Sequence, residues 1–197
     1  MLDQVIYCLA LITLVTVPAT LLAWLLIHHF VSLWRHVGSS WTMIAVSAVT
    51  VLAMLVMYLV REPLLRIRFG VYWPSALAGA ILLALSFYLN ALVYKRVPTS
   101  MALGLEEISA GDPGELVTDG VYSRLRHPRF LGMALAVAAM ALLTNFATIY
   151  ALFVLYVAAI FLIARLEDRE LLERFGSQYA EYARTVPRFF PRLRGLG

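Results

Sequence analysis

Two short groups of charged side chains in the second half of the chain could carry chemistry. Arg126 and His127 directly precede Pro128, at the start of a long uncharged stretch. Glu167 and Asp168 stand just beyond the end of that stretch. Such a set suits a zwitterion, because cations bind a carboxylate while acids bind an ammonium or hydroxyl groups. A helix starting at Pro128 would add free backbone N–H groups to the anion site. Snorkelling arginines and an ordinary surface ion pair are the alternative interpretation.

The uncharged stretch between the two groups must bring them together. It covers Phe130–Ala164, 35 residues, and would be about 52 Å long as one straight helix. That is too long for one ordinary crossing of a bilayer. Its most polar point is Thr144-Asn145. The stretch therefore predicts a helical hairpin with spans near Phe130–Leu143 and Phe146–Ala164, which returns the acidic pair to the face of the basic pair.

The composition indicates a membrane protein. Of 197 residues, 62% are hydrophobic and only 14% are charged, whereas a soluble domain is about half apolar and a quarter charged. Three further stretches contain no charge and are long enough to span a bilayer: Gln4–Trp34, His36–Val60 and Phe69–Tyr94. We therefore predict an all-α integral membrane protein with about five transmembrane helices. The last two form the hairpin, and an amphipathic C-terminal helix follows.

The basic residues predict the orientation. With the hairpin closed, the first loop, residues 95–129 and the tail share one side and hold 13 of the 16 Lys and Arg residues. Cytoplasmic segments are enriched in Lys and Arg, so the long loop and the tail should face the cytoplasm, as in a bacterial inner membrane. These basic residues lie next to the membrane spans. Membrane topology and contact with anionic lipid therefore explain the basic charge better than nucleic-acid binding does.

The chain divides into a three-span membrane region, residues 1–94, and a second part, residues 95–197, within one membrane domain. The lone cysteine, Cys8, lies in the first span, so neither an intrachain disulfide nor a cysteine-based metal site is expected. In the tail, an apolar stripe predicts a helix to about Arg184 that lies along the membrane or caps the site. Gly176 interrupts that helix and suggests close approach by another group. The stripe comprises Asp168, Leu171, Leu172, Phe175, Tyr179 and Tyr182.

Two motifs flank the hairpin. The first is Gly120-x-Tyr122-x-x-x-Arg126-His127-Pro128-x-Phe130-x-Gly132. The second is Glu167-Asp168-x-x-Leu171-x-x-x-Phe175-Gly176-x-x-Tyr179-x-x-Tyr182-x-x-x-Val186-Pro187. Together they resemble the isoprenylcysteine carboxyl methyltransferase family and the related phospholipid methyltransferases. The resemblance covers about residues 114–191, whereas the N-terminal half shares only its apolar spans.

The resemblance implies S-adenosylmethionine as the methyl donor, held at the cytoplasmic mouth of the hairpin. The cofactor contacts that it implies are Gly114, Glu115, Leu116, Val117, Tyr122, His127, Pro128, Arg129, Phe130 and Glu167. The charge argument adds Arg126 and Asp168. The family usually has tyrosine in place of Phe130 and a second glutamate in place of Asp168. Ile163 occupies the position of an arginine thought to hold the substrate carboxylate in eukaryotic isoprenylcysteine enzymes, and the nearest base, Arg165, becomes the candidate substrate contact.

We therefore expect methyl transfer to a lipophilic or membrane-embedded carboxylate, thiol or amine. No catalytic base is assigned, because a carboxylate or thiolate needs none. One alternative is an NADPH-dependent membrane reductase of sterol-reductase-like architecture, in which Arg124 and Arg129 would serve a 2′-phosphate. The other alternative is a non-catalytic membrane component, such as a transport accessory. That alternative predicts charged residues inside the spans, along a pathway. Oligomeric state, and the choice among O-, S- and N-methylation, stay open.

Overall fold

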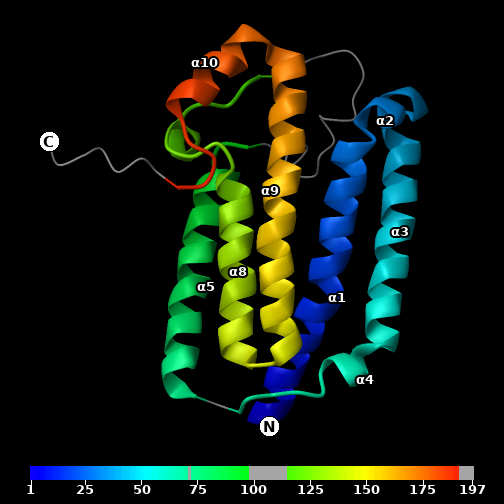
Figure 1. Ribbon diagram of the computed structural model, residues 1–197, viewed down its shortest axis with the longest axis vertical. Coiled ribbons are helices and arrows are strands. Elements are labelled where there is room, and N and C mark those ends of the chain that lie inside the picture. Colours follow the sequence, from blue (N-terminus) through cyan, green and yellow to red (C-terminus); the bar gives the residue numbers. More distant parts are fainter. Residues whose placement is uncertain (71, 98–114, 191–197) are drawn as a thin grey trace, which may run out of the picture.

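The computed structural model describes residues 1–70, 72–97 and 115–190, and only the backbone of Arg35. The long elements in these ranges are helices (Figure 1), which confirms the all-α prediction. They are α1 (Leu2–His29), α2 (Val31–Val37), α3 (Ser39–Leu59), α4 (Arg61–Leu64), α5 (Trp73–Tyr94), the short 3-10 helix η1 (Gly120–Ser123), α8 (Pro128–Thr144), α9 (Ala147–Phe175) and α10 (Ser177–Thr185).

Four of these helices, α1, α3, α5 and α9, are long and apolar enough to cross a membrane. The fifth, α8, is apolar but has 17 residues, about 26 Å at 1.5 Å per residue. The outer faces are apolar as well, since Leu52 and Leu59 of α3 and Phe87 of α5 are well exposed. The chain is thus an all-α integral membrane protein, and a fifth complete crossing stays a prediction.

The hairpin turns where the sequence predicted. Helix α8 ends at Thr144, and Asn145 adopts a left-handed conformation with φ 57°, which asparagine tolerates better than most residues. Its side chain is held on both sides: Nδ2 donates to the Gly70 carbonyl at 2.6 Å, and Oδ1 accepts from the Tyr150 hydroxyl at 2.8 Å. The turn at Thr144-Asn145 is confirmed.

The first uncharged stretch does not form one continuous helix. Helix α1 ends at His29, and α2 is a separate short helix after Phe30. Helix α2, the hairpin mouth and α10 lie at one end of the bundle, whereas α4 and the hairpin turn lie at the other (Figure 1). Helix α1 packs against a hydrophobic core that α8, α9 and the tail form. The core residues are Phe130, Ala134, Val137, Tyr156, Ile160, Ile163, Ala164 and Phe189.

Helices α5 and α8 pack closely through small residues. The Ser86 hydroxyl donates to the Gly132 carbonyl at 2.7 Å. A Cβ atom added at Gly132 would lie 2.8 Å from Nδ2 of Asn90, which donates to the Ser86 carbonyl. Glycine at 132 therefore sets how closely the two helices approach, and so where α8 presents its N-terminal residues.

Gly132→Ala is expected to lower the thermal unfolding midpoint in detergent, because overpacking costs about 1–3 kcal/mol. Adding Asn90→Ala should restore most of the loss, since it removes the clashing amide. An unchanged midpoint for the single variant would mean that the two helices separate without cost.

The tail departs from the sequence prediction at one residue. Helix α9 continues to Phe175, and α10 ends at Thr185, close to the predicted Arg184. Gly176 between them has φ 54°, and a Cβ atom added there would meet nothing within 4 Å among the described residues. Within that part of the chain, no group makes the close approach that the sequence suggested. Glycine is favoured here because the chain turns through a backbone conformation that other residues adopt poorly.

Candidate functional site

The hairpin mouth and the tail are joined by backbone hydrogen bonds. The Arg126 and His127 N–H groups donate to the carbonyls of Pro187 and Arg188, at 2.9 Å and 3.0 Å. His127 then precedes Pro128, the first residue of α8, where the missing N–H costs nothing. These bonds fix the side chains of residues 126 and 127 at the N-terminus of α8, facing the last turns of α9.

Asp168 accepts hydrogen bonds from four side chains. Arg126 Nη1 donates to its Oδ1 at 2.9 Å, and His127 Nε2 lies 2.8 Å from the same oxygen. The Tyr179 hydroxyl donates to Oδ1, and Arg188 Nε donates to Oδ2 at 2.5 Å. Asp168 is buried, so its charge is balanced inside the protein. The structure thus brings the predicted basic and acidic groups together, with Arg126 and Asp168 in direct contact.

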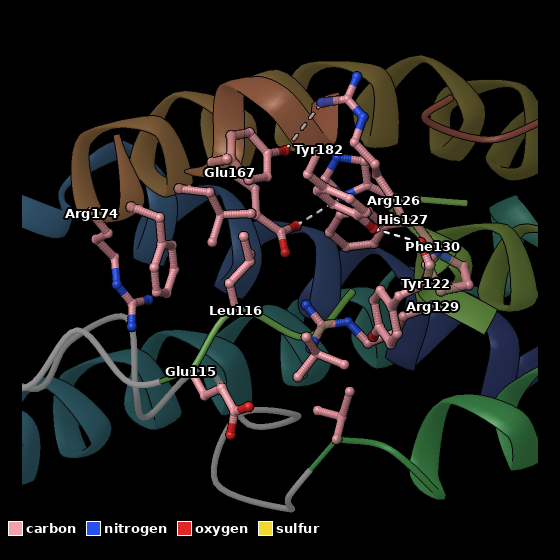
Figure 2. Close-up of a pocket in the computed structure, with 16 residues that line it drawn as sticks. Glu115, Leu116, Tyr122, Arg126, His127, Arg129, Phe130, Glu167, Arg174 and Tyr182 are labelled. Atoms are coloured by element: carbon pink, nitrogen blue, oxygen red, sulfur yellow. Dashed lines mark hydrogen bonds and ion pairs between the residues drawn. The ribbon is translucent and has the colours of Figure 1, made fainter. Parts of the chain in front are cut away.

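Glu167 is placed differently from its neighbour. Its Oε2 is buried and has no hydrogen-bond partner among the described residues. The nearest cationic atom is His127 Nδ1, 3.4 Å away, beyond a good hydrogen bond. The carboxylate of Glu167 lines a cavity with Tyr122, Arg129 and Arg174 (Figure 2). A buried acceptor without a partner has capacity for an N–H or O–H group of a ligand.

The imidazole of His127 is buried and lies between the carboxylates of Asp168 and Glu167. Burial opposes the charged imidazolium, but the two carboxylates outweigh it and hold the pKa of His127 above its ordinary value. His127 therefore stays protonated to a higher pH than a free histidine.

Stability should fall with rising pH through this residue. A raised pKa stabilises the fold below the unfolded-state value of about 6.5, and the contribution is lost as the pH passes the folded-state value. The gap between the thermal midpoints of the wild type and His127→Gln should therefore be largest at about pH 6 and shrink as the pH rises through the raised pKa of His127. A gap that widens as the pH rises would contradict the assignment.

Ten of the twelve residues predicted to bind cofactor line this cavity. They are Glu115, Leu116, Val117, Tyr122, Arg126, His127, Pro128, Arg129, Phe130 and Glu167. Asp168 lies behind the lining, bonded to Arg126 and His127. Gly114 lies outside the described residues. Arg165, the candidate substrate contact, is exposed and is not among the lining residues.

The cavity also includes residues that the sequence prediction did not assign to the site. They are Val97, Leu171, Arg174, Phe175, Tyr179 and Tyr182. Four of these belong to the apolar stripe, so the stripe caps the site. Arg174 follows Glu167 by two helical turns on α9, and that spacing places both on one face. This periodicity is the signal by which Arg174 could have been found.

The tyrosines close one side of the cavity. The Tyr182 hydroxyl donates to the Tyr122 carbonyl at 2.7 Å, which links α10 to η1. Burial raises the pKa of Tyr122 to about 12, so its phenol is neutral and available as a donor.

A comparison with known protein families identifies the family to which the chain is related. Residues 74–178 match the family described as phospholipid methyltransferase. The chain belongs to the phospholipid methyltransferase family. The matched region begins at α5 and ends just after Gly176, so it contains both helices of the hairpin and most of the cavity lining. The resemblance seen in the two sequence motifs is thereby confirmed.

Individual relatives of this family member match over shorter segments. The cobalt-zinc-cadmium resistance protein CzcN of Cupriavidus metallidurans is 38% identical over 87 residues, 44% of this chain and 40% of that protein. Methanethiol S-methyltransferase 2 of Bradyrhizobium diazoefficiens is 39% identical over 73 residues, 37% of this chain and 27% of that protein. The aligned segments thus span less than half the length of these relatives. No solved structure matches the chain.

Proposed function

We propose that the protein is a membrane methyltransferase that binds S-adenosylmethionine in the cavity at the hairpin mouth. The observation that carries this proposal is the Glu167 carboxylate, whose buried Oε2 makes no hydrogen bond among the described residues and which lines a cavity together with Arg129 and Arg174. A ligand that matches both signs of charge is a zwitterion with further hydroxyl groups. The methionine moiety of S-adenosylmethionine is such a zwitterion, and its ribose supplies hydroxyl groups.

The residues present fit this cofactor. Glu167 would accept from the ammonium or the ribose, and the two arginines would hold the carboxylate. Aromatic and aliphatic side chains complete the lining, including Phe130, Phe175 and Leu116. When bound, S-adenosylmethionine supplies an electrophilic methyl group on a sulfonium. The protein's own contribution is then to hold the reactants in register and to exclude water.

The acceptor is proposed to be lipophilic or embedded in the membrane. A second cavity, lined by apolar side chains of α8, α9 and the tail, lies beside the first. Phe189 lines it, and its ring lies 5.8 Å from that of His127, which lines the first cavity. An acceptor with an apolar body and a carboxylate, thiol or amine group suits this juxtaposition. The relative named methanethiol S-methyltransferase 2 gives further support for a thiol.

The proposed orientation follows from charge. Along the sequence, the first loop, residues 95–129 and the tail hold 13 of the 16 Lys and Arg residues, and helix α2, the hairpin mouth and α10 lie at one end of the bundle. That end is proposed to face the cytoplasm, where the cofactor is made.

Calorimetric titration of detergent-purified protein with S-adenosylmethionine, and separately with NADPH, tests the proposal. Saturable heat is expected with S-adenosylmethionine and none with NADPH. The reverse result would favour a membrane reductase and overturn the proposal. Transfer of a labelled methyl group into a membrane lipid extract, compared with transfer to a short-chain thiol, would then identify the acceptor class.

A further inference from the structure

The last turns of α1 reach the site from outside the family-matched segment. Trp24 and His28 are one helical turn apart on α1, and their rings stack with centroids 5.3 Å apart and an interplanar angle of 16°. His28 is buried. The upper end of α1 in Figure 1 lies beside α9 at the level of the hairpin mouth. Neither side chain lines the cavity, but Trp24 contacts Arg129 and Phe130, which do line it.

Trp24 supports Arg129. The guanidinium carbon of Arg129 lies 4.2 Å from the centroid of the Trp24 ring, within the range of a cation–π interaction. Arg129 also lines the cavity. Because an arginine side chain has many rotamers, an aromatic surface beneath its guanidinium restricts where the charge is presented.

His28 supports Arg174 through one intermediate residue. His28 Nδ1 lies 3.2 Å from Glu170 Oε2, and both side chains are buried. The other oxygen of Glu170 lies 4.0 Å from Arg174 Nη1, and Arg174 lines the cavity. The Glu170 carboxylate thus interacts with α1 through one oxygen and with a cavity arginine through the other.

We propose that α1 positions the two cavity arginines that bind the cofactor carboxylate, and that Trp24 and His28 are the positioning residues. This inference rests on the proposed function. Of the arginines that line the cavity, Arg126 is bonded to Asp168 and Tyr179, whereas Arg129 and Arg174 are the two that α1 supports. Glu115 and Glu167 of the same cavity are acidic and suit the ammonium and the ribose. Cations fixed before binding lose less entropy when the ligand arrives.

The test compares S-adenosylmethionine with decarboxylated S-adenosylmethionine, which keeps the ammonium, the sulfonium and the nucleoside. Both ligands are titrated into the full chain in detergent by calorimetry. The wild type should bind S-adenosylmethionine more tightly than the decarboxylated form. In Trp24→Leu and in His28→Gln, affinity for S-adenosylmethionine should fall about tenfold, or about 1.4 kcal/mol. Affinity for the decarboxylated form should stay within about twofold of the wild type.

Matched controls separate positioning from general damage. His29→Gln and Trp41→Leu make the same chemical changes at exposed positions, and should leave both affinities unchanged. Trp24→Phe keeps a ring beneath Arg129 and should retain most of the preference for the carboxylate.

Each other result has a defined meaning. If the wild type binds neither ligand, the proposed function itself fails. If the wild type binds both equally, or if the α1 variants keep the wild-type preference, the proposed role of Trp24 and His28 is wrong. If the affinities of an α1 variant for both ligands fall by the same factor, the substituted residue maintains the whole site and has no particular link to the carboxylate. That result also overturns the inference.

Discussion

Glu167→Gln is expected to weaken S-adenosylmethionine binding about 100-fold. The substitution keeps the size of the side chain but removes the negative charge from the cavity lining. Loss of one member of a buried, charge-assisted contact costs about 2–5 kcal/mol, and about 2.7 kcal/mol corresponds to 100-fold in affinity. Calorimetric titration of the purified variant measures the effect directly.

This variant should be less stable than the wild type, because the Glu167 carboxylate lies 3.4 Å from His127 Nδ1 and helps to keep that buried imidazole protonated. The thermal midpoint should fall by less than in Asp168→Asn, since Oε2 of Glu167 makes no hydrogen bond within the described residues. Glu173→Gln on the same helix is the matched control, since its carboxylate is exposed and pairs only with Arg169 among the described contacts. Equal cofactor affinity in the two variants would exclude Glu167 from the binding site.

Asp168→Asn should instead destabilise the protein, by about 3 kcal/mol or more. It leaves Arg126, His127 and Arg188 without the carboxylate that they share. Removing one partner of a buried charge cluster costs about 3–5 kcal/mol, because the other charges stay buried without compensation. A clearly lower thermal midpoint in detergent is the expected result, with or without cofactor.

Asp119→Asn provides the comparison for this prediction. Asp119 forms an exposed ion pair with Arg96, and exposed pairs contribute little. If both aspartate variants unfold at the wild-type midpoint, the four contacts to Asp168 do not hold the hairpin mouth to the tail.

The sequence predicts the hairpin well because its signals are local. The uncharged length, the polar Thr144-Asn145 pair and the Pro128 start each depend on neighbouring residues alone, and all three agree with the structure. The site residues between 115 and 130 also depend on local signals. They belong to one short segment that leads into α8, and they line one cavity.

Features that depend on contacts between distant residues could not be predicted in this way. Charge alone cannot tell that Asp168 is bonded to Arg126 while its neighbour Glu167 faces the cavity, because that difference is set by the rotation of α9 against α8. The contribution of α1 is likewise invisible, since Trp24 and His28 are ordinary members of an apolar span. The reason for Gly176 could not be predicted either, because a turn and a close approach both favour glycine, and only the backbone angle distinguishes them.

The unequal lengths of α8 and α9 determine how deep the proposed active site lies in the membrane. Helix α9 has 29 residues and α8 has 17, a difference of about 18 Å at 1.5 Å per residue. One turn joins the C-terminus of α8 to the N-terminus of α9. The N-terminus of α8 therefore does not reach as far along the bundle as the C-terminus of α9, and the cavity occupies the step between these two helix ends. A bilayer core of about 30 Å would place this step near the lipid headgroups. Bilayer thickness would therefore control how far a membrane-dissolved acceptor must rise to reach the methyl donor, so activity in vesicles should vary with lipid chain length.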